Sequence, residues 1–277
     1  MKISRTKHQI RQEIKQISSV DVESVPIGYL KHKIDGLLKG MWTPWFGGPF
    51  HEVWRARKGE FNHVSELWYP PKECVSKLGR MNEKNDSMFY SCFGLNARPG
   101  SLEEIRADVG DRITQLSCSL NPSDKLLKVL SLGHADQWMK EKAPSNMKHR
   151  FINAEAEYKR DCGSEEQYQR SLLLKDWVNE KFIENVADGE EHNYAHSVAI
   201  SKGFFDGFNC DAILYPSVAA STKAINLVMR PEVADDYFTP IYARIVEVLS
   251  KSPTGIELKL KNESKSISTD GTINWSW

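Results

Sequence analysis

The sequence has no excess of charge of either sign and no long hydrophobic run. Its 277 residues contain 37 Lys and Arg and 37 Asp and Glu, so the formal net charge is zero. A broad nucleic-acid-binding surface normally needs a basic excess, so no direct nucleic-acid partner is expected, although a small basic pocket is compatible with this balance. No apolar run approaches the roughly 18 residues that span a bilayer, and the polar start at Met1–Lys7 lacks the apolar segment of a secretory signal. We therefore expect a cytoplasmic protein without a membrane partner.

Metal-binding and disulfide patterns are also missing. The five cysteines occur singly and in odd number, which is typical of reduced thiols rather than of a disulfide framework or a zinc site. The sequence contains no GxGxxG, GxxxxGK[ST], GxSxG or HExxH motif. His192 and His196 have the spacing of metal ligands on a helix, but no third ligand is indicated, so no metal is expected.

The predicted elements indicate an α+β fold, because helices and strands mix without regular alternation. The first forty residues predict a helical hairpin, with Ser24 as a cap of the second helix, Pro26 at its start and Gly40 at its end. Further helices are predicted at Ser101–Val109, Glu165–Ala187 and Asn193–Phe205, the first with Ser101 and Glu104 as a capping box. Strands are predicted at Glu52–Ala56, Ser87–Phe93, Arg112–Leu120, Asp211–Val218, Ala224–Met229, Tyr237–Leu249 and Ile256–Lys261.

These elements suggest three parts along the chain. Residues 1–48 are expected to be an N-terminal helical extension, in which Met41–Pro49 is an aromatic-rich connector. Residues 49–262 are expected to form the main domain. Residues 263–277 are rich in Ser, Thr, Asn and Lys and are expected to be a loosely ordered tail, whose end Trp275 and Trp277 could hold in place.

Two arginines are candidates for binding an anion. Arg80 lies in the turn-like stretch Gly79-Arg80-Met81-Asn82, where its guanidinium could reach a phosphate bidentately. The alternative is a surface arginine bonded to its own loop. Arg55 lies in an apolar strand, where burying a charge is costly without a partner, so an acidic partner or an anionic ligand is expected.

Three further residues could complete such a site. Tyr90 is expected either to stack on a flat ring or to pack in the core. Glu103 and Glu104 are expected to open a helix, where the helix dipole alone would explain them. Ser217 ends the apolar run Ala212-Ile213-Leu214-Tyr215, and Pro216 before it makes an interior ladder position unfavourable.

Six short motifs follow one another along the chain: Trp54-Arg55, Gly79-Arg80-Met81-Asn82, Phe89-Tyr90, Glu104-Ile105-Arg106, Asp211–Ser217 and Asn226-Leu227. Their order resembles that of the RES domain family, which supplies the toxin of many bacterial toxin–antitoxin pairs. The resemblance covers about Phe50 to Leu249. It implies a compact ADP-ribosyltransferase-like core around an NAD cleft. It also implies that NAD is the substrate and that its nicotinamide–ribose bond is broken by hydrolysis or phosphorolysis.

The resemblance also assigns roles. Arg55 and Arg80 would hold the pyrophosphate, Tyr90 would pack on the nicotinamide, Glu104 would be the catalytic carboxylate and Ser217 would position the ribose. Asn82, Tyr194 and Ser197 match further pocket positions. The sequence departs from the family at Met81, where an aromatic residue is usual. The spacing from Tyr90 to Glu104 is also longer than in the family, so Glu103 is an alternative to Glu104 as the catalytic carboxylate.

Other functions stay open at this point. The enzyme could transfer ADP-ribose to a protein or nucleic acid, or the chain could be a catalytically silent binding module. The resemblance implies an antitoxin protein as a partner. The N-terminal helices could instead regulate the enzyme or assemble it into a homo-oligomer.

Overall fold

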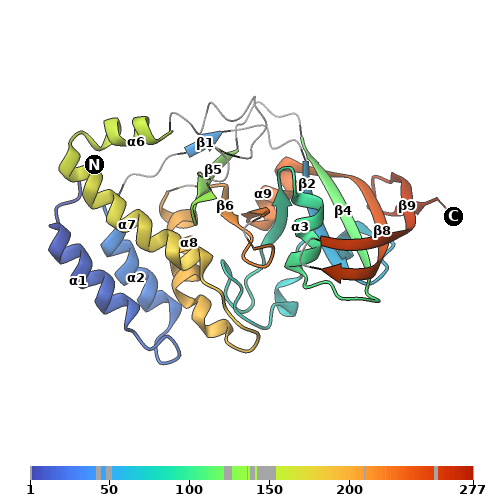
Figure 1. Cartoon of the computed structure of the whole chain (residues 1–277), viewed down its shortest axis with the longest axis horizontal. Helices are drawn as coiled ribbons and strands as arrows, with labels where there is room; N and C mark the ends of the chain where they lie inside the picture. Colours follow the sequence, from blue (N-terminus) through green and yellow to red (C-terminus); the bar gives the residue numbers. More distant parts are fainter. Residues whose placement is uncertain are drawn as a thin grey trace. The chain divides into compact units, whose positions relative to one another are not determined.

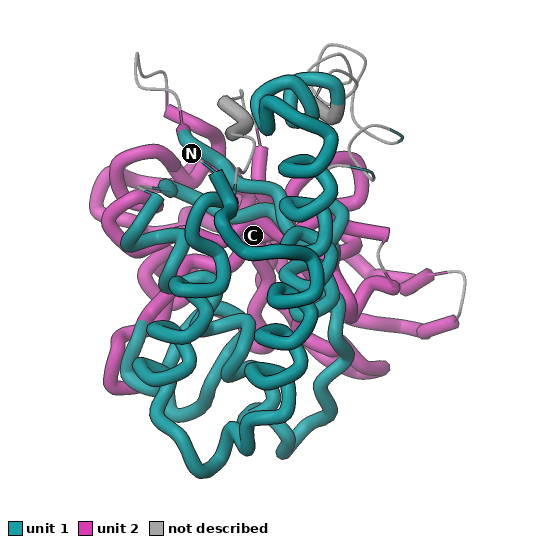
Figure 2. Tube along the Cα trace, turned by 90° about the vertical axis from the view of Figure 1, so that its left-hand side faces the viewer, with its two compact units in different colours: residues 1–47, 75–86, 128–216 teal, residues 48–74, 87–127, 217–277 magenta. Residues whose placement is uncertain are grey.

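A computed structural model describes residues 2–41, 45–47, 52–121, 127–135, 137, 141, 154–208, 210–221, 223–252 and 255–276. The predicted α+β class is confirmed, as are the N-terminal helices. The chain forms two compact units that interleave along the sequence (Figure 2). Unit 1 is Met1–Gly47, Val75–Asp86 and Lys128–Pro216, and unit 2 is Gly48–Cys74, Ser87–Leu127 and Ser217–Trp277.

Unit 1 consists mainly of helices that pack side by side. Helix α1 packs on α7 and α2 packs on α8 (Figure 1). Strand β1 pairs antiparallel with β5, and β5 pairs parallel with β6. The elements are α1 (Lys7–Ser18), α2 (Ile27–Leu38), β1 (Trp45–Gly47), β5 (Lys128–Ser131), α6 (Ala154–Cys162), α7 (Glu165–Ile183), η3 (Glu191–Tyr194), α8 (Ala195–Gly207) and β6 (Ala212–Pro216).

The N-terminal hairpin forms for the expected reason. Ile10 and Ile17 of α1, and Leu30 and Ile34 of α2, are buried at helical spacing. The backbone at Gly40 is left-handed (φ 87°), which ends α2 and favours glycine. The predicted Ser24 cap is wrong, because its hydroxyl donates to the carbonyl of Asp21 instead, and Pro26 occupies the cap position without a side-chain bond.

Unit 2 is an antiparallel sheet with short helices. Its seven described strands lie in the order β7-β3-β2-β4-β8-β9-β10. Helix α3 packs against β2, β3 and β7, and Figure 1 shows it beside β2. The elements are β2 (Glu52–Lys58), η1 (Val64–Glu66), η2 (Lys72–Cys74), β3 (Phe89–Phe93), α3 (Ala97–Glu104), β4 (Arg112–Leu120), β7 (Ile225–Met229), α9 (Pro231–Tyr237), β8 (Phe238–Ser252), β9 (Gly255–Ile267) and β10 (Ile273–Trp275).

The structure corrects three sequence predictions. Helix α3 ends at Glu104 rather than beginning near it, and Ser101 is a buried residue inside the helix, so the capping box is wrong. The tail is not loose, because β9 and β10 form an antiparallel ladder and Trp275 Nε1 donates to Asn62 Oδ1 at 2.9 Å. The connector at Met41–Pro49 contains strand β1. Trp277 lies outside the described residues.

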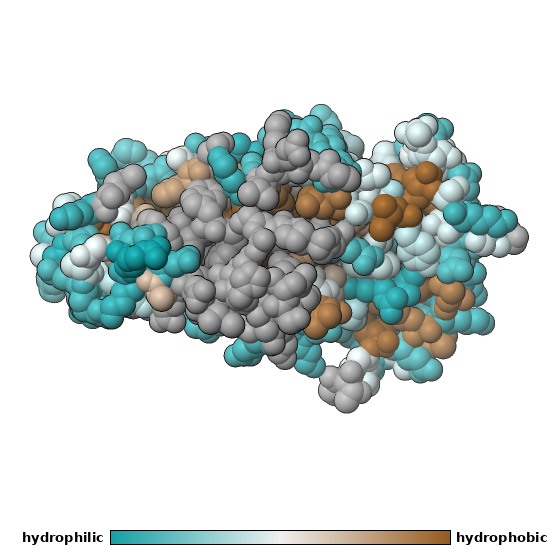
Figure 3. Space-filling model, turned by 90° about the horizontal axis from the view of Figure 1, so that it is seen from above, coloured by the Kyte–Doolittle hydropathy of each residue, from teal (hydrophilic) through white to brown (hydrophobic). Residues whose placement is uncertain are grey.

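Within the described residues, no helix is long and apolar enough to cross a bilayer. Apolar side chains on the face seen in Figure 3 form separate patches between hydrophilic ones. Scattered exposed apolar residues of this kind are normal for a folded protein.

Candidate functional site

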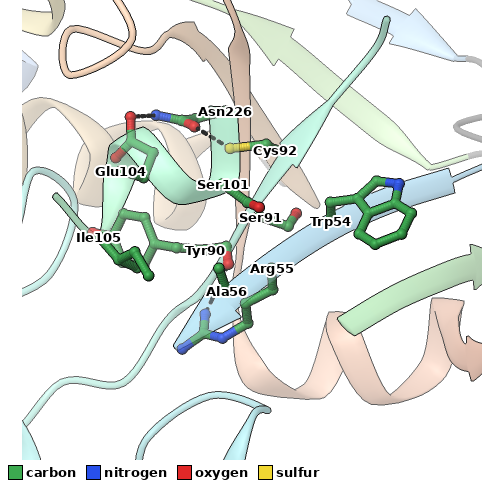
Figure 4. A pocket seen from close by; sticks show the side chains of 10 residues that line it. All are labelled: Trp54, Arg55, Ala56, Tyr90, Ser91, Cys92, Ser101, Glu104, Ile105 and Asn226. Atoms are coloured by element: carbon green, nitrogen blue, oxygen red, sulfur yellow. Dashed lines mark hydrogen bonds between the residues drawn. The ribbon is translucent and has the colours of Figure 1, made fainter. Parts of the chain in front are cut away.

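A cavity opens in unit 2 where two strands of the sheet separate. Strand β2 pairs with β3 only through Val53↔Phe93 and Trp54↔Cys92, although it pairs with β4 along its whole length. Beyond that point the side chains of both strands border a cavity of about 230 Å³, which α3 and β7 complete. The cavity is lined by Trp54, Arg55, Ala56, Tyr90, Ser91, Cys92, Ser101, Glu104, Ile105 and Asn226 (Figure 4).

Glu104 is the carboxylate of this cavity. It is the last residue of α3, and its Oε1 atom accepts two hydrogen bonds, from Ser217 Oγ at 2.5 Å and from Asn226 Nδ2 at 2.7 Å. Both donors are buried, whereas Glu104 itself is exposed. Among the described residues, no hydrogen bond or ion pair involves Oε2 of Glu104. One carboxylate oxygen is thus fixed by the protein, and the other is left for a ligand.

The orientation of Asn226 is itself fixed. Its Oδ1 accepts a hydrogen bond from Cys92 Sγ at 3.2 Å, so its Nδ2 is directed at Glu104 (Figure 4). Burial, with the nearby Glu104 charge as a smaller cause, raises the pKa of Cys92 well above its usual value. Cys92 therefore stays a protonated thiol and serves here as a donor, not as a nucleophile.

Arg55 is the cation of the cavity. Its Nη1 donates to the carbonyl of Tyr90 at 2.8 Å across the gap between β2 and β3, and its guanidinium lies 5.5 Å from the ring centroid of Phe89. Burial is the main cause that lowers the pKa of Arg55 to about 10, so the group is still cationic at neutral pH. Its buried Nε has no partner, and no carboxylate among the described residues forms an ion pair with it. The expected acidic partner is thus not found among the described residues, and the expected anionic ligand stays a prediction.

Glu103 lies elsewhere. It borders a second cavity of unit 2 together with Pro99, Ala224 and Lys251, and its carboxylate lies 3.7 Å from the ammonium of Lys251. Consecutive helical residues point about 100° apart, so Glu103 and Glu104 reach different cavities. The expectation that both open a helix is wrong, since both lie at the end of α3.

Four other predicted site residues belong to unit 1. Arg80 is only 8% exposed, which excludes the alternative of a surface arginine. Its guanidinium lies 4.8 Å from the ring centroid of Tyr194, and Ser197 Oγ donates to its carbonyl oxygen at 2.7 Å. Asn82 is buried beside it in the chain and donates to the carbonyl of Glu83.

Arg80, like Arg55, forms no ion pair with a carboxylate in the part of the chain that the structure describes. Its Nη2 donates to the carbonyl of Glu184 at 3.0 Å, and the ring centroid of Tyr215 lies 5.8 Å from the guanidinium. Its buried Nη1 is unpartnered among the described residues. The predicted pairing of Arg80 with Arg55 around one pyrophosphate stays a prediction, because the two arginines belong to different units.

Both histidines of the predicted pair have partners in the protein. Nε2 of the buried His196 donates to the carbonyl of Ile17 at 3.0 Å, and His192 lies 3.3 Å from the carboxylate of Glu23. In the part of the chain that the structure describes, no three His, Cys, Asp or Glu side chains gather as a metal site would require.

Sequence reasoning missed Asn226 as a site residue. The available signal was an asparagine in the otherwise apolar run Ile225-Asn226-Leu227-Val228-Met229, because a buried amide needs hydrogen-bond partners. Comparisons of the sequence with models of known protein families and with curated proteins find no match. The resemblance to the RES domain therefore rests on the quoted motifs alone.

Proposed function

We propose that the unit 2 cavity binds the nicotinamide–ribose end of NAD and that the protein cleaves the bond between them, as a RES-type enzyme would. The observation that carries the proposal is the setting of Glu104. Ser217 and Asn226 hold one oxygen of this carboxylate, and Arg55, which forms no ion pair among the described residues, lines the same cavity. A carboxylate held in place, an aromatic ring and a cation without a carboxylate partner among the described residues are the groups that an anionic, ribose-containing ligand requires.

The chemistry follows from the bond that breaks. Departure of nicotinamide leaves positive charge on the ribosyl carbon and ring oxygen, and the electron pair of the bond leaves with the ring, which becomes neutral. A preorganised carboxylate stabilises this charge more in the transition state than in the ground state. Water then adds to the ribosyl carbon and releases a proton, or phosphate adds in its place.

The remaining residues have positioning roles in this proposal. Tyr90 would pack on the nicotinamide, Ser217 would act through Glu104, and Arg55 with Arg80 would hold the pyrophosphate. Asn82, Tyr194 and Ser197 would support Arg80. An ADP-ribosyltransferase-like core and a toxin role neutralised by an antitoxin protein belong to the same proposal and rest on the resemblance.

The test compares two adjacent glutamates. Purified full-length protein is incubated with NAD, with and without phosphate, and nicotinamide release is measured. Glu104→Gln should lower kcat by about 100-fold or more, the scale of one electrostatic group in the transition state. Glu103→Gln, the matched control, should keep activity near the wild-type value.

Three results would redirect the proposal. Absence of nicotinamide release from the wild type under both conditions would refute it and favour a silent binding module. Labelled NAD that marks a macromolecule would favour ADP-ribose transfer. A Glu104→Gln variant as active as Glu103→Gln would remove Glu104 from the mechanism.

A further inference from the structure

Two arginines face the same indole at the edge of the unit 2 cavity. The guanidinium carbons of Arg98, on α3, and of Arg244, on β8, lie 5.9 and 5.8 Å from the ring centroid of Trp54. Trp54 also lines the cavity, and Figure 4 shows it on the side away from Glu104. The two cations therefore lie close to a residue that lines the cavity.

No carboxylate of a described residue forms an ion pair with either arginine. Among the described residues, the guanidinium of Arg98 has no hydrogen bond and no ion pair, although it is exposed. Glu263 lies opposite Arg244 in the β8–β9 register, but it accepts a hydrogen bond from the Tyr242 hydroxyl at 3.0 Å and forms no ion pair with Arg244. Burial first, and the like charge of Arg98 second, lower the pKa of Arg244.

A buried, neutral amide holds this arrangement in place. Gln115 is fully buried, and its Oε1 accepts hydrogen bonds from Nε and Nη2 of Arg244 at 2.9 and 2.5 Å. Its Nε2 donates to the carbonyl of Arg98 and to Ser101 Oγ, both on α3. A glutamate at this position would have neutralised Arg244, whereas the glutamine orients the guanidinium and leaves its charge available.

The Arg244 charge is held in place and the Arg98 charge is carried on the helix beside it, and two like charges that no carboxylate among the described residues pairs with are unfavourable until an anion binds near both. Arginine also presents paired donors that match the oxygens of a phosphate. The cavity itself is smaller than the roughly 300–1,000 Å³ of sites that enclose drug-sized ligands, so part of a dinucleotide or a second reactant would lie outside it.

We propose that Arg98 and Arg244 bind a phosphate dianion beside Trp54. This inference rests on the proposed function for the source of that phosphate, which is either the 2′-phosphate of NADP or free inorganic phosphate. In the second case a phosphate oxygen bonds to the ribosyl carbon as the N-glycosidic bond breaks, and the electron pair leaves with nicotinamide.

Direct binding tests the site without relying on activity. Inorganic phosphate is titrated into the full-length protein and followed by phosphorus NMR and calorimetry. Arg98→Gln should weaken phosphate binding at least tenfold, and Arg98→Lys should recover part of it. Arg112→Gln is the matched control, because Arg112 is an exposed arginine of unit 2 whose charge is paired with Glu60. Wild-type protein without phosphate binding, or equal binding by the Arg98→Gln and Arg112→Gln variants, overturns the proposal.

Activity then identifies the source. If the bound phosphate is the 2′-phosphate of NADP, Arg98→Gln lowers kcat/KM for NADP at least tenfold. The kcat/KM for NAD then stays unchanged in phosphate-free buffer. If it is inorganic phosphate, the wild type forms a sugar 1-phosphate and Arg98→Gln raises the half-saturating phosphate concentration at least tenfold. Turnover of NADP and NAD that Arg98→Gln leaves unchanged, with and without phosphate, contradicts the proposed site. A wild type that binds phosphate but cleaves neither dinucleotide refutes the proposed function and leaves the phosphate site standing.

Discussion

Replacing Gly100 with alanine should separate α3 from β7 and disturb the Glu104 site from a distance. A methyl group on Gly100 would lie 2.4 Å from the Cβ of Ala224, whereas carbon atoms in contact lie about 3.5–4.0 Å apart. The helix must therefore move by roughly 1.1–1.6 Å at this point. Glu104 lies one helical turn further along α3, so its bonds of 2.5 and 2.7 Å to Ser217 and Asn226 would lengthen beyond hydrogen-bonding distance.

The expected energy is the balance of two effects. Overpacking a buried contact costs about 1–3 kcal/mol, and alanine returns about 0.5–1 kcal/mol of helix propensity relative to glycine. We expect Gly100→Ala to lower the free energy of unfolding by about 0.5–2 kcal/mol, measured by chemical denaturation. The same change at Gly36, a helical glycine with open space around it, should raise stability by about 0.5–1 kcal/mol.

A double mutant distinguishes the contact from other causes. Ala224→Gly removes the atom that Gly100→Ala would strike, so the double mutant should be more stable than the sum of the two single effects predicts. Nicotinamide release, where the wild type shows it, should fall in Gly100→Ala and recover in the double mutant. A Gly100→Ala variant as stable as the wild type, with additive effects in the double mutant, would refute the reasoning.

Two further predictions concern unit 2 away from the cavity. Trp275→Ala should lower the free energy of unfolding by about 3–5 kcal/mol, because the side chain is buried. Trp275→Phe should cost less, since it keeps most of the aromatic packing; its loss of the bond to Asn62 accounts for about 0.5–1.5 kcal/mol. Equal unfolding curves for wild type and Trp275→Ala would show that the C-terminal strand contributes nothing. The hydrogen bond to Asp235, the largest cause, raises the pKa of Tyr69 to about 12, so its protonated form is favoured in the folded state. The stability that this bond contributes should be complete below about pH 10 and should decline as the pH rises towards 12. Tyrosinate absorbance of wild type and Tyr69→Phe measures this, and a Tyr69 that titrates near pH 10 contradicts it.

Elements with a strong hydrophobic period were predictable from the sequence. The α1–α2 hairpin follows from isoleucines and leucines at helical spacing, and the predicted strand Arg112–Leu120 coincides with β4. The strand β9 was predicted only as far as Lys261, since most of its side chains are exposed and carry no alternating pattern. Its remaining residues are ordered by backbone pairing with β10, which composition does not reveal.

The polar contacts of the site were less predictable. The sequence predicts that Arg55 needs a partner, because an arginine in an apolar strand is costly to bury alone. The gap between β2 and β3 was not predictable, because it depends on where the pairing of two strands stops. Asn226 and Ser217 are more than one hundred residues from Glu104 in sequence, so only the fold brings their donors to one carboxylate oxygen.

The choice between Glu103 and Glu104 shows what local sequence leaves undecided. The two glutamates are chemically identical and adjacent in the sequence. Only the phase of α3, that is, its rotation about its own axis, decides which cavity each side chain reaches. That phase is set by the helix boundaries and by Gly100, which allows the close approach to Ala224. In this phase Glu103 meets Lys251, while Glu104 meets two neutral donors that fix its position without cancelling its charge. A carboxylate that stabilises a developing cation must be positioned but not neutralised, and of the two only Glu104 satisfies both conditions.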